Sequence, residues 1–396
     1  MAPSLQLSAT MNRSAHKLLF ELLGQPTAPF REALVMATAA KHLTRAGVPH
    51  FHDPHGNLVV GVGSQRDYSR LVGQRSPNPL RLLIAHCDHP GFHGVRWIGP
   101  ETLQVRWLGG TPTRYLRGAR VWLAHERGVV GHGHILRATL LPSHHAIDTA
   151  EIRLTKPQPA HSAATLYGGF AFRAPVWQSG KRIYTKAADD LVGVFAVLAT
   201  AMRLFRERRR KAAPFLGLLT RGEEVGFVGT IAHLELDWLA AARRPVVVVS
   251  LETSRTLPGA LIGHGPVVRL GDRRTVFDSA YSHVLTELAA RALPGQHQRR
   301  IMDGGSCEAT AATAWGLPAI GISVPLGNYH NQGLEGGPGC RGLNGPAPEF
   351  VHLDDVEGLQ KLCYSLFDPG RHWEQPWHTL RQRLALNFSR YRRLLG

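Results

Sequence analysis

The stretch LLTRGEEVGFVGT, residues 218–230, runs from a short apolar strand through two adjacent glutamates into glycines that lead to a helix. Other apolar runs also end in a polar cluster: LRLLIAHCDHPGF (80–92), RPVVVVSLET (244–253) and LPAIGISVPLG (317–327). Apolar runs without alternation are typical of strands that are covered on both faces, as in an α/β sheet. Helical patterns lie between the runs, at 189–210, 278–293 and 354–368. We therefore expect an α/β fold.

The chain has 396 residues, which is too long for one small core and indicates two domains or one domain with an insertion. Residues 99–182 differ from the rest, because short alternating strands and turn residues replace the long helical patterns. We predict that 99–182 form a small inserted β-rich domain, for oligomerisation or substrate access. Residues 1–98 and 183–396 would together form the α/β catalytic domain.

Composition limits the classes of partner. The formal net charge of +17 can steer anionic partners. The specific signs of nucleic-acid binding are missing, however, because the sequence has no basic arm, no zinc-finger spacing and no RNA-binding aromatic signature. The densest basic run, RERRRK (206–211), closes an apolar helical stretch, where cations suit the helix dipole. We expect no nucleic-acid partner, and the meaning of the +17 charge stays open.

Membrane association and secretion are not expected either. The longest apolar helix candidate, residues 191–205, falls short of the roughly 20 residues that a membrane span needs. The N-terminal residues lack the positively charged segment followed by an apolar segment that is typical of a secretory signal peptide. The four cysteines show no CxxC pairing, and a reducing compartment suits so large a chain. A cytoplasmic location is the expectation.

Side chains that can bind metals follow the predicted strands and begin the elements after them. Imidazoles and carboxylates suit zinc, cobalt or manganese in the absence of thiolate clusters. Ligands bind at the carboxyl ends of strands in such sheets. One glutamate of an adjacent pair can bind a metal, while the other serves as general base toward water. The candidates are His86 and Asp88 in AHCD, Asp189 and Asp190 in KAADD, Glu223 and Glu224 in RGEEVG, Glu252 in SLET, and His330 in NYHNQ.

The order of these motifs resembles the glutamyl aminopeptidase / tetrahedral (TET) aminopeptidase family of di-metal metallopeptidases. Supporting matches are DPHGNLVVGVG near the start, GHGPVVRLGD (263–272) and GLPAIGISVP. The resemblance implies a mixed-sheet zinc-peptidase (phosphorylase/hydrolase-like) catalytic domain with the β-rich insertion. It also implies two divalent metal ions per subunit, with zinc expected and cobalt or manganese as alternatives, and a homo-oligomer.

The resemblance also implies residue roles. One metal would bind His86 and Glu252, the second would bind Glu224 and His330, and Asp189 would bridge the two. Glu223 would be the general base. Asp88 would hydrogen-bond the ring nitrogen of His86 that does not bind the metal, and would thereby fix the orientation of the ring.

Three positions depart from the family pattern. Glu252 stands where the family usually has Asp, and a glutamate can still ligate. GGSCEA (304–309) replaces a GGTDA-like segment, so Cys307 and Glu308 could serve helix-start packing or substrate contact. The Gly/Pro-rich residues 331–349 should form an irregular loop.

The implied activity is that of a metal-dependent aminopeptidase, which hydrolyses N-terminal residues of peptides with a metal-activated water and a glutamate base. One alternative is a related di-metal deacylase or carboxypeptidase that acts on N-acyl amino acids or C-terminal residues. Another alternative is a non-catalytic, metallopeptidase-like binding protein. The sequence leaves the preferred N-terminal residue, the resident metal and the number of subunits open.

Overall fold

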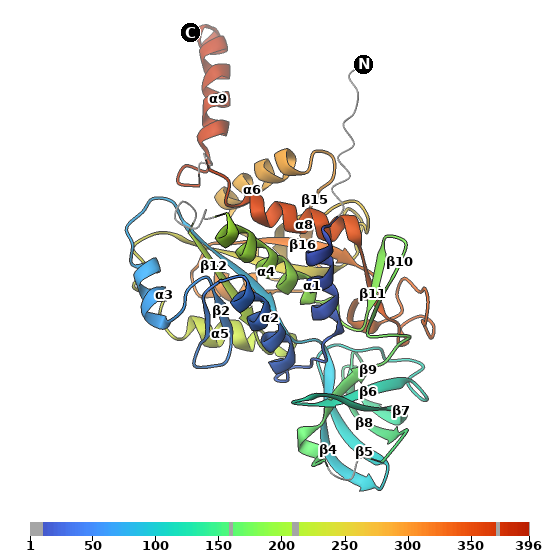
Figure 1. Cartoon of the computed structure of the whole chain (residues 1–396). Coiled ribbons are helices and arrows are strands. Elements are labelled where there is room, and N and C mark those ends of the chain that lie inside the picture. The colour runs from blue at the N-terminus through green and yellow to red at the C-terminus, as the bar shows by residue number, and fades with distance from the viewer. Residues whose placement is uncertain (1–10, 158–160, 208–213, 370–372, 396) are drawn as a thin grey trace.

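The computed structural model describes residues 11–157, 161–207, 214–369 and 373–395. It contains an α/β domain built on an eight-stranded sheet, and a closed β-barrel that lies beside it (Figure 1). The predicted fold class, a mixed-sheet α/β domain with a small β-rich insertion, is confirmed.

The central sheet is mixed. β12, β3, β13 and β16 pair in parallel, whereas β14 pairs antiparallel with β16, and the β1–β2 hairpin pairs antiparallel with β12. The strand order is β1 (His50–His52), β2 (Leu58–Val60), β12 (Phe215–Thr220), β3 (Leu80–His86), β13 (Val246–Arg255), β16 (Ala319–Leu326), β14 (Val267–Asp272) and β15 (Gln298–Met302). The parallel strands β12, β3 and β13 are therefore neighbours, and their carboxyl ends meet at one edge.

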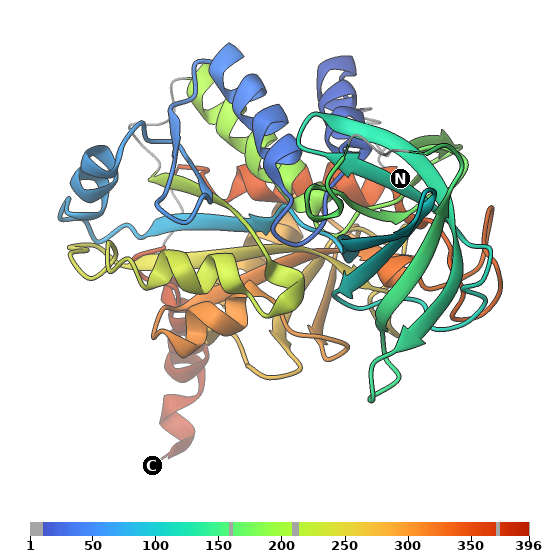
Figure 2. The ribbon, with the colours of Figure 1, turned by 90° about the horizontal axis from the view of Figure 1, so that it is seen from below.

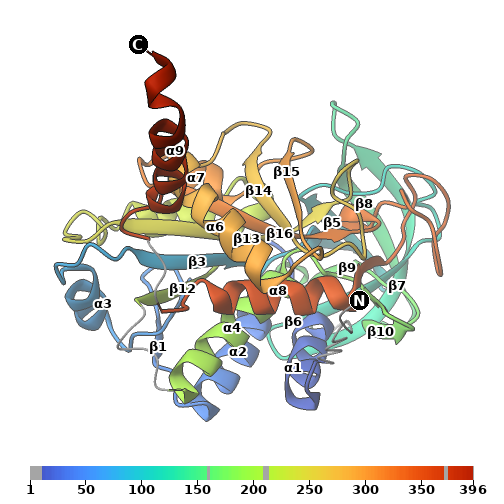
Figure 3. The same cartoon turned by 90° about the horizontal axis from the view of Figure 1, so that it is seen from above.

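Both faces of the sheet are covered. Successive side chains of a strand point to opposite faces, so Leu83 and Ala85 of β3 join one core while Leu82 and Ile84 join the other. The helices of the larger core are α1 (Arg13–Gly24), α2 (Ala33–Arg45), α4 (Leu191–Arg206), α6 (Ser279–Ala292) and α8 (Leu353–Ser365). The second face packs α3 (Gln65–Val72) and α7 (Glu308–Ala314), and α5 (Val228–Leu234) lies against α7. Figures 2 and 3 show these layers from below and above.

Helix α4 begins next to the candidate site and runs through the larger core. Asp190 is its N-cap, and the Asp190 side chain accepts a hydrogen bond from the Gly193 amide at 3.1 Å. The helix ends at Arg206, which begins the basic run 206–211, and residues 208–211 of that run lie outside the described residues. The apolar run at 191–205 is thus a buried core helix.

The barrel has a core of its own. Phe92, Trp107 and Phe170 are buried there with the branched side chains of its other strands. Its strands follow the order β4 (Gly91–Gly99), β5 (Thr102–Leu108), β8 (Ile147–Leu154), β7 (Gly128–Leu140), β6 (Arg120–His125) and β9 (Tyr167–Phe170). These strands occupy residues 91–170, whereas the sequence placed the insertion at 99–182.

The chain returns to the α/β domain through a small three-stranded sheet. Its strands are β10 (Val176–Ser179), β11 (Arg182–Thr185) and β17 (Glu349–His352). β11 leads to the start of α4, and β17 leads to α8, so this sheet ties two segments that border the candidate site. A last helix, α9 (His378–Tyr391), projects from the body with the C-terminus (Figure 1). No helix in the described part of the chain has both the length and the apolarity to cross a membrane.

The packing of the larger core leads to a testable prediction about the free energy of unfolding. Phe195 of α4 is fully buried in it, so Phe195→Ala should lower the free energy of unfolding by about 3–5 kcal/mol. Val276 is 76% exposed, so Val276→Ala should change that free energy by about 0.5 kcal/mol or less. Chemical denaturation of the two variants measures both values, and equal losses would contradict the packing described here.

Candidate metal centre

Several strand ends meet at one edge of the sheet. His86 is the last residue of β3, and Glu252 lies near the end of the neighbouring β13. Glu223 and Glu224 follow β12 in the short helix η3 (Glu223–Val225). Asp189 directly precedes the N-cap of α4. Four of these side chains come from the ends of the neighbouring parallel strands β12, β3 and β13, and Asp189 joins them from the start of α4.

His330 reaches the same place from the other side. It lies in η4 (Tyr329–Asn331), after β16, with a positive φ of 54°. The barrel backs its ring, because a Cβ added at Gly110 would lie 2.4 Å from His330 Nδ1. Only glycine fits at that approach, so the loop after β5 helps to hold the imidazole.

The carboxylate of Asp189 lies between the two imidazoles. Its Oδ1 is 3.5 Å from His86 Nε2, and its Oδ2 is 3.5 Å from His330 Nε2. The same nitrogen of His330 is 3.1 Å from Glu224 Oε2. Glu223 Oε2 is 3.8 Å from His86 Nε2. Each oxygen of Asp189 thus faces a different histidine, which is the arrangement that a bridging carboxylate needs.

Two sets of side chains can each offer three ligand atoms that lie within 4.8 Å of one another. One set is His86, Glu223 and Glu252, and the other is His86, Asp189 and Glu224. The sequence had grouped Glu252 with His86 and had given Glu223 a separate role. Here Glu223 lies close to both, so its distance from the cluster does not by itself distinguish a base from a ligand.

The chemistry of this cluster fits a cation. Asp189 Oδ1, Glu224 Oε1 and Glu252 Oε1 are buried and have no hydrogen-bond partner within the described part of the chain. A buried carboxylate oxygen without a partner is costly, and such oxygens normally bind a donor or a metal. Asp190 Oδ2 and Glu308 Oε2 also lack a partner among the described residues, but the three oxygens named first belong to predicted ligands, which supports divalent ions as their partners.

The electrostatics point the same way. Burial raises the pKa of Glu223 and of Glu252 well above the usual value, and neighbouring carboxylates raise both further. Burial opposes the charged form of His330, but the charge of Glu224 and the hydrogen bond to Asp189 raise its pKa to about 10. For Asp189, burial alone would raise the pKa, and the contacts with His330 and His86 lower it instead. Negative charge exceeds positive charge here, so a cation would relieve the repulsion.

Asp88 holds the two glutamates through the backbone. Its Oδ1 accepts the Glu223 amide at 3.0 Å, and its Oδ2 accepts the Glu224 amide at 3.1 Å. The predicted contact with His86 is longer, because Nδ1 lies 3.6 Å from Asp88 Oδ1 and 3.1 Å from the Asp88 main-chain oxygen. The main-chain oxygen therefore accepts from the ring, and the carboxylate fixes the turn that carries Glu223 and Glu224.

The buried carboxylate of Glu349 also accepts hydrogen bonds from backbone amides at the site. This residue was not identified from the sequence. Its Oε2 accepts the amides of Ala188 at 2.6 Å and Asp189 at 3.2 Å, and its Oε1 accepts the His330 amide at 2.8 Å. Burial and the charge of Asp189 raise the pKa of Glu349 to about 8. It is the last residue of the Gly/Pro-rich segment 331–349, and only its place at the end of that segment could have drawn attention to it.

Cys307 and Glu308 are both fully buried, which favours the packing interpretation over substrate contact. Glu308 Oε1 accepts the hydroxyls of Thr220 and Thr230 at 2.5 Å each. Cys307 Sγ lies 3.6 Å from Asp272 Oδ2. These contacts tie the start of α7 to the ends of β12 and β14, behind the site.

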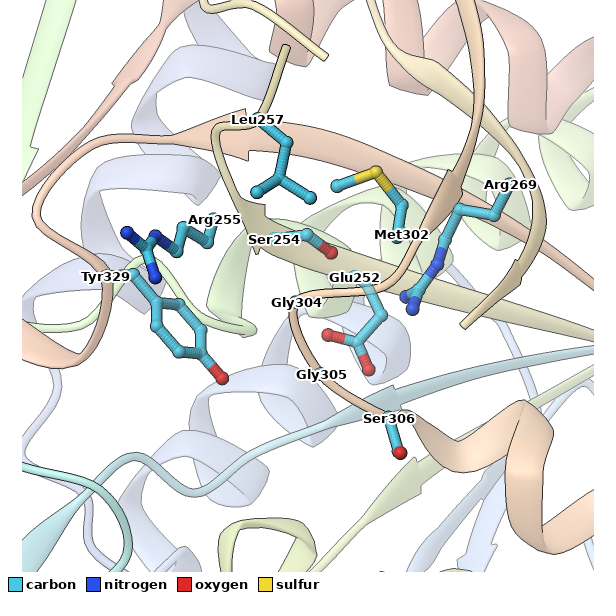
Figure 4. A pocket seen from close by; sticks show the side chains of 10 residues that line it. All are labelled: Glu252, Ser254, Arg255, Leu257, Arg269, Met302, Gly304, Gly305, Ser306 and Tyr329. Atoms are coloured by element: carbon cyan, nitrogen blue, oxygen red, sulfur yellow. The ribbon is translucent and has the colours of Figure 1, made fainter. Parts of the chain in front are cut away.

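A pocket opens beside Glu252 (Figure 4). Arg269 is 2% exposed on its wall, and its Nε and Nη1 have no hydrogen-bond partner among the described residues. Tyr329 stacks on the ring of His330 with centroids 3.7 Å apart, so the pocket adjoins both sides of the candidate centre. The other lining side chains are Ser254, Arg255, Leu257, Met302 and Ser306. The pocket therefore offers two guanidinium groups next to the carboxylate cluster.

Comparison with known proteins places this fold and site in a class. Residues 70–334 match the sequence model of M42 glutamyl aminopeptidases, and the chain belongs to that family. A search of curated proteins found no match.

Solved structures share the fold at low identity. The TET aminopeptidase of the marine archaeon Thaumarchaeota archaeon SCGC AB-539-E09 has a TM-score of 0.71 and 18% identity, over 92% of this chain and 99% of that one. The TET1 peptidase of Pyrococcus horikoshii has a TM-score of 0.69 and 18% identity, over 90% and 99%. The aminopeptidase APDkam598 of Desulfurococcus kamchatkensis has a TM-score of 0.69 and 20% identity, over 91% and 97%.

The contacts of Glu349 generate a prediction about metal affinity. In Glu349→Gln, an amide NH₂ would face at least one backbone N–H, so the segments of Asp189 and His330 should shift. Metal affinity should fall about 10- to 100-fold, as is typical when a group that orients ligands is lost. Isothermal titration of the metal-free protein with zinc measures this change.

A matched control is Asp355→Asn. Asp355 is equally buried and accepts the amides of Gly263 and Gly265, which belong to a loop without a candidate ligand. This variant should lose stability but keep its zinc affinity. If both variants lost affinity alike, the effect of Glu349 would be one of general stability.

Proposed function

We propose that this chain is a metal-dependent aminopeptidase that uses two divalent cations, with zinc favoured and cobalt or manganese also suited to the ligands. The observation that carries the proposal is the carboxylate of Asp189, whose two oxygens face His86 and His330 at 3.5 Å each. Membership of a glutamyl aminopeptidase family supports the same activity.

The residues divide into two ligand sets that share Asp189. His86 and Glu252 would complete the first set, and Glu224 and His330 would complete the second. When bound, the cations would polarise the scissile carbonyl and lower the pKa of water. Glu252 supplies a carboxylate where the family usually has aspartate, and its unsatisfied Oε1 is consistent with a ligand.

Glu223 is the proposed general base. Burial raises its pKa well above the usual glutamate value, which suits a group that takes up a proton and gives it away again. Its carboxylate would accept the proton of the attacking water and pass it to the leaving amine. Asp88 would hold the Glu223 amide and so keep the carboxylate in place.

Metal removal and one substitution test this mechanism together. Chelation should abolish peptide hydrolysis, and zinc should restore it. Glu223→Gln keeps the shape of the side chain but cannot accept the proton, so kcat should fall by about 100- to 10,000-fold. Metal content, measured by mass spectrometry, should stay at two ions per chain. Hydrolysis at the wild-type rate would exclude the mechanism, and a loss of one ion would make Glu223 a ligand instead.

The pocket beside Glu252 favours a substrate that carries a carboxylate. The guanidinium groups of Arg255 and Arg269 line it, and the buried Arg269 has nitrogen atoms left to donate. In an aminopeptidase, the carboxylate would belong to an N-terminal glutamate or aspartate. In the alternative deacylase or carboxypeptidase, it would be the α-carboxylate of an N-acyl amino acid or of a C-terminal residue.

Substrate panels distinguish these alternatives. We expect cleavage of glutamyl peptides with a free N-terminus, and no cleavage of the same peptides after N-acetylation. Arg255→Met should lower kcat/KM for glutamyl peptides about 10- to 100-fold, because a charge-assisted hydrogen bond is lost, and should affect leucyl peptides much less. Arg127→Met, at an exposed turn of the barrel, is the control. Faster cleavage of the acetylated peptides would support the deacylase instead.

We also propose a homo-oligomer in a reducing, cytoplasmic setting. One structure with this fold is described as a dodecamer of PhTET1, and TET1 of Pyrococcus horikoshii is described as a tetrahedron or a large octahedral shell. All four cysteines of this chain are free thiols, and three of them are buried. Light scattering in solution would give the number of subunits.

A further inference from the structure

The C-terminal helix α9 differs from every other long helix of the fold, because it has no buried residue. Its apolar residues nevertheless follow a helical spacing. Leu384, Phe388 and Tyr391 of α9 and Leu395 of the short 3-10 helix η5 (Arg392–Leu395) that follows it recur at intervals of four, three and four residues, and they are 56%, 60%, 51% and 80% exposed. We call these four residues the apolar stripe. A stripe with this spacing lies along one face of a helix, which is normally the face that a partner covers.

The root of the helix is attached to the body, while the stripe lies farther out. Trp377 stacks on His283 of α6 with ring centroids 5.0 Å apart. Residues 381–395 are all exposed, and at about 1.5 Å per residue they extend roughly 22 Å. Isolated helices of this length are only marginally stable in water, so a covering surface would stabilise α9.

Charge indicates what covers the stripe. Glu374 is the last acidic residue of the chain, whereas five arginines follow it. Helical spacing places Arg381 and Arg392 on one flank of the stripe and Arg383 and Arg390 toward the other flank. A flat anionic surface can receive an apolar stripe and contact cations on both flanks at once.

The same pattern disfavours a second copy of this helix as the partner. If two copies paired along their stripes, the arginine flanks would face each other without any acidic residue to pair with them. An anionic partner is the one that this charge distribution suits.

Contrary to the expectation from the sequence that the chain has no membrane partner, we propose that α9 is a docking helix that lies flat on an anionic lipid surface. An arginine-rich polar side and an apolar side with leucine and aromatic residues are the features of helices that lie in the membrane interface. Phe388 and Leu384 enter the acyl boundary, while the arginines contact lipid phosphates. The helix rests on the membrane and does not span it, in agreement with its length. This role is independent of the peptidase chemistry.

Vesicle flotation of the full chain tests the proposal. Vesicles of phosphatidylglycerol and phosphatidylcholine in equal amounts should carry the protein, and vesicles of phosphatidylcholine alone should not. Binding should weaken steeply with added salt. Leu384→Gln with Phe388→Gln should lower the partition coefficient by about tenfold or more, because two apolar side chains leave the interface. Arg383→Gln with Arg390→Gln should lower it by about tenfold or more.

Leu386 provides the matched control. It is 72% exposed on the same helix but lies on the face opposite to the stripe. Leu386→Gln should leave binding within about twofold of the wild type. An equal loss in Leu386→Gln would overturn the proposal, since binding would then not depend on the stripe.

Two further outcomes overturn the proposal and identify the other possible partners. Light scattering of the Leu384→Gln, Phe388→Gln variant should give the wild-type mass. If vesicles do not bind and this variant has a lower mass, a second copy covers the stripe. If vesicles do not bind and the mass is unchanged, an acidic groove on another protein is the partner. Peptide hydrolysis in free solution should be the same in all these variants.

Discussion

The site depends on the placement of one carboxylate between two imidazoles. Asp189 faces His86 with one oxygen and His330 with the other, and each contact is an ion-pair distance of 3.5 Å. At 3.5 Å both contacts are long for a hydrogen bond. Buried carboxylates repel each other at low dielectric, and the cluster is favourable only with positive charge among them. The surrounding fold holds Asp189 in this position.

Backbone amides supply much of that support. Asp88 accepts the amides of Glu223 and Glu224, and Glu349 accepts those of Asp189 and His330. The segments that carry these four side chains are thereby fixed at their main chain, and the side-chain oxygens and nitrogens stay available. Hydrogen bonds from neutral amides to a buried carboxylate also stabilise its charge. Glu349 acts on two segments at once, and Asp88 acts on two adjacent residues, so the loss of either group would displace two residues of the candidate site together.

Sequence patterns predicted four central strands, and most of the candidate residues that follow those strands lie together in the structure. Unbroken apolar runs predicted β3, β12, β13 and β16, and the polar residues that follow them converge because parallel strands end at the same edge. The entry into the barrel was harder to place. β4 begins at Gly91, only a few residues after His86, so no composition change separates the domains there. Glu349 could not be found either, since its role depends on pairing between β11 and β17, which are far apart in sequence.

Longer-range placement also explains the substitutions that looked like departures from the family. The sequence alone left Cys307 and Glu308 open because a residue at a helix start can face either the core or the site. The fold brings Thr220 and Thr230 to Glu308, and their two hydroxyls satisfy one of its oxygens. Glu308, which lies behind the site, therefore links β12 to α5 through these two hydrogen bonds. Arg255 and Arg269 are the cationic side chains that line the adjacent pocket. Substrate recognition would therefore depend on β13, on β14 and on residues 304–306, which also line the pocket, whereas Cys307 and Glu308 support these segments from behind.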